Sequence, residues 1–122
     1  MSKSSATWTE TVLVDFAYSN GGLPLSTLLM DASGNLYGTT SIGGLNSRGT
    51  AFKASPNVGG GWNLSVLYGF KDARDGGTPE GNLVMDASGN LYGTGSTGGR
   101  PSGSGSNNTG NGVVFQLTPP AN

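Results

Sequence analysis

Apolar and polar residues alternate in short runs along this chain, a pattern typical of β-strands. In residues 8–16, Trp8, Val12, Val14 and Phe16 share one face, on which Glu10 is the one polar residue. Residues 26–31 and 35–40 are predicted to form a hairpin. Its tight turn, Ala-Ser-Gly, follows an aspartate that can cap it. Further short strands are expected at 49–55, 62–70, 82–86, 90–95 and 112–117. No apolar run has the period of a helix.

The chain is a tandem repeat. Residues 30–39 (Met-Asp-Ala-Ser-Gly-Asn-Leu-Tyr-Gly-Thr) return unchanged as residues 85–94, an offset of 55. Residues 8–16 match residues 62–70 at an offset of 54, which aligns Glu10 with Leu64. Residues 49–54 match residues 112–117 at an offset of 63, because the second copy has a low-complexity insertion at 99–111. A unit of about 55 residues with four short strands indicates a β-propeller blade.

The repeat is displaced relative to the blades. Residues 26–70 supply a complete four-stranded blade, and residues 82–117 supply a second blade that lacks its outer strand. An additional outer strand, residues 8–16, stands at the start of the chain. Residues 1–7 are expected to be flexible, and residues 118–122 form a tail. We therefore expect residues 8–16 to complete the last blade of a neighbouring chain.

Two blades cannot close a ring by themselves, because each blade has two apolar faces that neighbours must cover. The fold class predicted is all-β, with two four-stranded propeller blades per chain and a ring closed by homo-oligomerisation with strand exchange. The number of blades is then even. Propellers have about 4–8 blades, which favours a six-bladed trimer, with an eight-bladed tetramer as the alternative. A piece cut from a longer or engineered repeat protein is the other interpretation.

Several motifs occur in a recognisable order. They are Gly-Asn-Leu-Tyr-Gly-Thr-Thr at 34–40, Gly-Thr-Ala-Phe-Lys at 49–53, Val-Leu-Tyr-Gly-Phe at 66–70 and Asp-Gly-Gly-Thr-Pro at 75–79. This order resembles the GloVer tandem repeat of bacterial choice-of-anchor proteins. The resemblance implies a propeller-like repeat in secreted or surface-anchored proteins, and it implies no enzyme activity. The start of this chain lacks the apolar core of a signal peptide, so its compartment is left open.

Composition narrows the range of functions. The chain has 122 residues with a formal net charge of −1, which argues against a nucleic-acid or polybasic membrane partner. It has no cysteine and no histidine, so it lacks a thiolate nucleophile, the commonest general base and the commonest metal ligand. No run approaches the ~18 apolar residues of a membrane span. We expect no catalytic residue, metal or cofactor.

Binding of a carbohydrate is the alternative function. Trp8 and Trp62 open equivalent strands, where indoles could stack on sugar rings or simply cover the core. Loops expected on one rim of the propeller carry polar candidates for ligand contacts: Asn46, Arg48, Asp72, Arg74, Asp75 and Arg100. Asp72 and Asp75 lack the alternating spacing of a calcium loop.

Three classes of function follow. The favoured one is a self-assembling module with a structural or scaffold role, whose partner is itself. The alternative is a lectin-like propeller with sites at blade interfaces or on the rim. An enzyme that uses carboxylates such as Asp72 and Asp75 is the least favoured.

Overall fold

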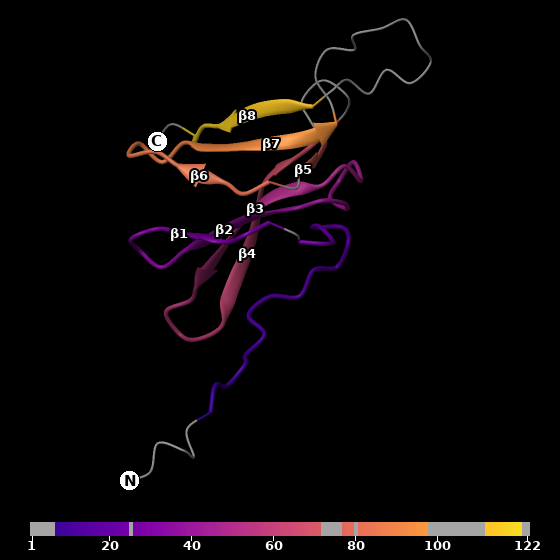
Figure 1. Cartoon of the computed structure of the whole chain (residues 1–122). Coiled ribbons are helices and arrows are strands. Elements are labelled where there is room, and N and C mark those ends of the chain that lie inside the picture. Colours follow the sequence, from indigo (N-terminus) through magenta and orange to yellow (C-terminus); the bar gives the residue numbers. More distant parts are fainter. Residues whose placement is uncertain (1–6, 25, 72–76, 80, 98–111, 121–122) are drawn as a thin grey trace, which may run out of the picture.

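The computed structural model describes residues 7–24, 26–71, 77–79, 81–97 and 112–120. These residues form two antiparallel β-sheets and no helix, which confirms the all-β class (Figure 1). Accordingly, the described residues include no helix able to span a membrane.

The first sheet contains β1 (Leu29–Met30), β2 (Leu36–Thr40), β3 (Thr50–Pro56) and β4 (Trp62–Gly69). They pair in the order β1-β2-β3-β4, as expected for a meander built from consecutive strands. The register of β3 and β4 shifts between Ala51 and Phe52, which leaves Leu67 of β4 without an opposite residue. Residues 26–70 therefore supply the four strands that the repeat predicts, with an inner strand shorter than expected.

The second sheet contains β5 (Gly77–Pro79), β6 (Val84–Met85), β7 (Leu91–Thr97) and β8 (Val113–Leu117). β6 and β5 pair with successive parts of β7 along one edge, and β8 pairs along the other edge. β5 is a correction, because the sequence predicted no strand between residues 70 and 82; glycine and proline there are typical of turns. No described strand pairs with the outer edge of β8.

Residues 8–16 form no strand in the single chain, contrary to the strand expected from their alternation. A strand needs a partner edge for its backbone hydrogen bonds, and this segment has none within the chain. It lies instead against the first sheet, where the rings of Phe16 and Phe52 pack edge to face with centroids 5.0 Å apart. Figure 1 shows it trailing from the first sheet, away from β7 and β8.

The core lies between the two sheets. Tyr37 of β2 packs with Leu83 and Leu91 of the second half of the chain, and all three are buried. Partly buried side chains from both sheets surround them: Leu29, Met85, Phe115 and Leu117. The two repeats are therefore held together by one apolar interface.

The second glycine of the repeated motif lies under a phenylalanine ring. A Cβ atom at Gly38 would approach Cζ of Phe52 to 2.8 Å, and one at Gly93 would approach Cζ of Phe115 to 2.7 Å. Phe52 is 5% exposed and also packs against the ring of Phe16, so its ring has little room to move. The motif needs glycine here to let the ring of the next strand lie across it.

The first prediction concerns this contact. Gly38→Ala should lower the free energy of unfolding by about 1–3 kcal/mol, because the added methyl overpacks a buried ring. Gly69→Ala is the control, since a Cβ atom there meets nothing within 4 Å, and its effect should stay within about 0.5 kcal/mol. Urea unfolding of both variants measures the difference. Equal effects would contradict the packing role of Gly38.

Candidate functional site

The side chains proposed for glycan binding are spread over the molecule. Trp62 opens β4 opposite Pro56, at one end of β3. Asn46 and Arg48 are exposed in the loop before the other end of β3. A seven-residue strand is about 23 Å long, so these side chains cannot share a sugar ring. Trp8 is fully exposed. Asp72, Arg74, Asp75 and Arg100 lie outside the described residues.

The repeated ten-residue motif forms a locked turn. The carboxylate of Asp31 accepts hydrogen bonds from the backbone N–H groups of Ser33 and Asn35, at 2.9 and 3.0 Å. Its second oxygen accepts from Nδ2 of Asn35 and from the hydroxyl of Tyr37, both at 2.9 Å. Gly34 closes the turn with a φ of 87°. The expectation of a tight turn capped by an aspartate is therefore confirmed.

The second copy of the turn is built in the same way. Asp86 accepts hydrogen bonds from Ser88, Asn90 and Tyr92 over 2.8–3.0 Å. The side-chain bond from Asn35 is the largest of the interactions that lower the pKa of Asp31 to about 2, and Asn90 does the same for Asp86. Burial, followed by its bond to Asp31, raises the pKa of Tyr37 to about 12. These shifts follow from the turn itself, so they do not mark a catalytic site.

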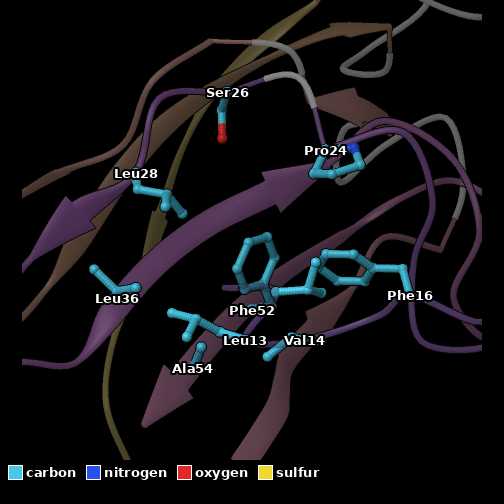
Figure 2. A pocket seen from close by; sticks show the side chains of 10 residues that line it. Leu13, Val14, Phe16, Pro24, Ser26, Leu28, Leu36, Phe52 and Ala54 are labelled. Carbon is cyan, nitrogen blue, oxygen red and sulfur yellow. The ribbon is translucent and has the colours of Figure 1, made fainter. Parts of the chain in front are cut away.

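Two cavities have equivalent walls. One, of about 660 Å³, lies between the sheets and is lined by Val66, Leu67 and Tyr68 on one side and by residues such as Leu91 and Leu117 on the other. A second, of about 400 Å³, lies between the N-terminal segment and the first sheet (Figure 2). Its lining includes the repeat equivalents of those five residues: Val12, Leu13, Val14, Leu36 and Ala54. The N-terminal segment therefore lies on the first sheet as the end of β4 lies on the second.

Aromatic contacts repeat the same relation. Phe70 follows β4, is 1% exposed and packs edge to face on Phe115 with ring centroids 5.0 Å apart. Phe16 and Phe52 are the repeat equivalents of Phe70 and Phe115, and their centroids are also 5.0 Å apart. Figure 2 shows the ring of Phe16 beside that of Phe52. Sequence matching aligned these residues, but it gave no sign that they touch.

The first sheet has an open apolar face on the side of the N-terminal segment. We call it the leading face, and it carries Leu28, Met30 and Leu36. Leu28 is 53% exposed, whereas its repeat equivalent Leu83 is 3% exposed against the first sheet. Pro24 is likewise exposed, whereas the equivalent Pro79 is fully buried.

The second sheet has an open apolar face on the side away from the first sheet. We call it the trailing face, and it carries Val84, Tyr92 and Val114. Val114 is 81% exposed, whereas its repeat equivalent Ala51 is 0% exposed. Tyr92 is only half-buried, whereas Tyr37 lies in the core. Each of these repeat positions is therefore buried in the sheet where it faces the other sheet, and exposed in the sheet where it faces away.

The described residues offer little for chemistry. They contain no group of three acidic, histidine or cysteine side chains able to hold a metal ion. They also contain no buried side-chain polar atom without a hydrogen-bond partner. The candidate functional site is therefore the set of open features described above: the leading face, the trailing face and the outer edge of β8.

The second prediction concerns the turns. Because the folded pKa of Asp31 and Asp86 lies below the ordinary value of 3.8, their stabilisation is complete above about pH 4 and is lost as the pH falls towards 2. In the double variant Asp31→Asn/Asp86→Asn, the melting temperature should fall less steeply between pH 4 and 2 than in the parent chain. Thermal unfolding followed by circular dichroism at pH 4, 3 and 2 tests this. Parallel pH profiles would contradict it.

Comparison with known proteins gives one match. The family model described as Gloeobacter/Verrucomicrobia repeat matches residues 1–122. No curated protein and no solved structure matches the chain.

Proposed function

The chain belongs to the Gloeobacter/Verrucomicrobia repeat family, and we propose that it is a self-assembling β-propeller module with a scaffold role and no catalytic activity. Its partner is a second copy of itself. Each copy contributes two blades, and copies join head to tail until the ring closes.

The contact between Phe16 and Phe52 carries this proposal. Its repeat equivalent, Phe70 on Phe115, joins the end of one sheet's outer strand to the face of the following sheet. Phe16 therefore lies where the end of an outer strand from the preceding sheet would lie. The sheet that fits is the second sheet of another copy, because it is the one without an outer strand.

The exposed faces support the same arrangement. Within the chain, the face that carries Tyr37 packs on the face that carries Leu83 and Leu91. The trailing face is the repeat equivalent of the former, and the leading face is the equivalent of the latter. Packing the trailing face of one copy on the leading face of the next repeats an interface that the molecule already makes. Such a head-to-tail contact closes when its rotation divides a full turn.

The pairing of β3 with β4 defines the register of the exchanged strand. Lys53 lies opposite Ser65, and Ala54 lies opposite Leu64. Shifted by the repeat offsets, Thr11 of one copy pairs with Gln116 of β8 in the next, and Glu10 pairs with Leu117. This strand also removes the open edge of β8, which would otherwise promote aggregation. Three copies give six blades and four give eight, and we favour three.

The third prediction concerns mass. Light scattering of the purified chain should give an integer multiple of 12.2 kDa, three being favoured over four. Deletion of residues 1–16 should prevent closure, because the second sheet then receives no outer strand. A parent chain of 12.2 kDa in solution would refute the proposal.

The fourth prediction concerns the register. The chain has no cysteine, so Thr11→Cys/Gln116→Cys introduces one possible pair per interface. Oxidation should give a ladder of covalent oligomers on a non-reducing gel, because paired residues have Cα atoms about 5.5 Å apart.

Asp15→Cys/Gln116→Cys is the matched control. It moves one thiol four residues, about 13 Å, along the strand, and it should give no ladder. An oxidised Thr11→Cys/Gln116→Cys product that stays monomeric would show that the segment closes its own chain, which contradicts the exchange.

A further inference from the structure

Lys53 lines the cavity between the two sheets. Its Nζ atom lies 5.8 Å from the centroid of the Tyr37 ring, and its side chain is half-buried. No carboxylate among the described residues pairs with this ammonium group. The cavity that it lines, of about 660 Å³, is otherwise walled mainly by apolar side chains such as Val66, Leu91 and Leu117. A half-buried cation in such a cavity is costly unless a counter-charge pairs with it.

Glu10 is an acidic group that the sequence alone does not explain. It stands among Trp8, Val12 and Val14 on the apolar face of residues 8–16, and its repeat equivalent is Leu64. Within the single chain it is exposed. An acidic residue at a position that is apolar in the other repeat suggests a partner specific to one of the two blade interfaces.

The register of the exchanged strand brings these two charges together. Leu64 lies opposite Ala54, and Leu117 is the repeat equivalent of Ala54. A strand 8–16 paired with β8 therefore places Glu10 opposite Leu117, and directly opposite residues share one face of a sheet. Leu117 lines the same cavity as Lys53. The carboxylate of Glu10 then extends into the cavity that contains the ammonium group of Lys53.

We propose that Glu10 of the incoming copy forms an ion pair with Lys53 of the receiving copy, and that this pair selects the edge of β8 as the docking site of residues 8–16. This inference rests on the proposed ring. A slip of one residue would turn Glu10 to the other side of the sheet and leave Lys53 unpaired. The pair therefore contributes to specificity by penalising wrong registers.

The other blade interface carries no such pair. Its equivalent positions are Gln116 in place of Lys53 and Leu64 in place of Glu10, and both are uncharged. An incoming strand with leucine at this position would leave Lys53 without Glu10 as its counter-charge. At the other interface, a glutamate in place of Leu64 would face the uncharged Gln116 instead of a lysine. The charges thus distinguish residues 8–16, which complete a sheet of another copy in the proposed ring, from β4, which completes a sheet of its own chain.

Charge exchange in the full-length chain tests the pair. Glu10→Lys and Lys53→Glu should each weaken assembly by about tenfold or more per interface, because each places like charges in the cavity. The double variant Glu10→Lys/Lys53→Glu should recover assembly to within about threefold of the parent. Asp15→Lys/Lys53→Glu is the control, since it makes the same charge changes with the new lysine elsewhere on the strand, and it should not recover. Light scattering over a dilution series measures all four variants.

The possible outcomes separate this inference from the ring. A parent chain that assembles, with no recovery in the double variant, would refute the ion pair and leave the ring intact. A monomeric parent chain would refute both. Recovery in Asp15→Lys/Lys53→Glu as well would also refute the specific pair, because only overall charge would then matter. Recovery confined to Glu10→Lys/Lys53→Glu would support it.

Discussion

Burial of both faces of a small sheet is the constraint on which the rest of this structure depends. A four-stranded sheet with short strands has little area, and its apolar side chains alternate between two faces. One face of each sheet is covered within the chain, through the cluster of Tyr37, Leu83 and Leu91. The remaining two faces stay open, with Leu28 and Val114 largely exposed. The contact between the sheets therefore covers one face of each sheet and leaves an equivalent pair of faces uncovered, which is the basis for the proposed association.

Details that first suggest a site are explained by this architecture. The repeated motif holds a turn through Asp31 and Asp86, and its second glycine makes room for a phenylalanine ring. Each phenylalanine in turn packs against a second ring: Phe115 against Phe70, which follows β4, and Phe52 against Phe16 of the N-terminal segment. The glycine of the turn motif thus makes room for the phenylalanine ring, and that ring makes the aromatic contact of the sheet.

The repeat in the sequence predicted most of the strands, because identical letters at offsets of 54, 55 and 63 fix both the order and the register of the copies. It missed β5, since Gly-Thr-Pro has the composition of a turn and pairs only because β7 extends beyond β6. It also gave both Trp62 and Arg48 as candidate ligand contacts, and the structure places them near opposite ends of β3. The alternation of apolar and polar residues shows which side chains share a face of a sheet, but it does not show which side chains lie at the same end of paired strands. The contact of Phe16 with Phe52 could not be predicted, because the spacing of two aromatic residues in the sequence does not determine the distance between their rings.

The sequence repeat begins with an outer strand, whereas each sheet begins with its inner strand. This difference affects how the number of repeats in one polypeptide can increase. Each outer strand is followed in the chain by the inner strands of the next sheet, so the covalent link always crosses a boundary between sheets. Duplicating the unit in tandem would place every internal outer strand beside the sheet that it completes, without any new contact. If the proposed ring holds, gene duplication would convert an assembly of short chains into one long polypeptide, or the reverse, while each sheet keeps the same neighbours.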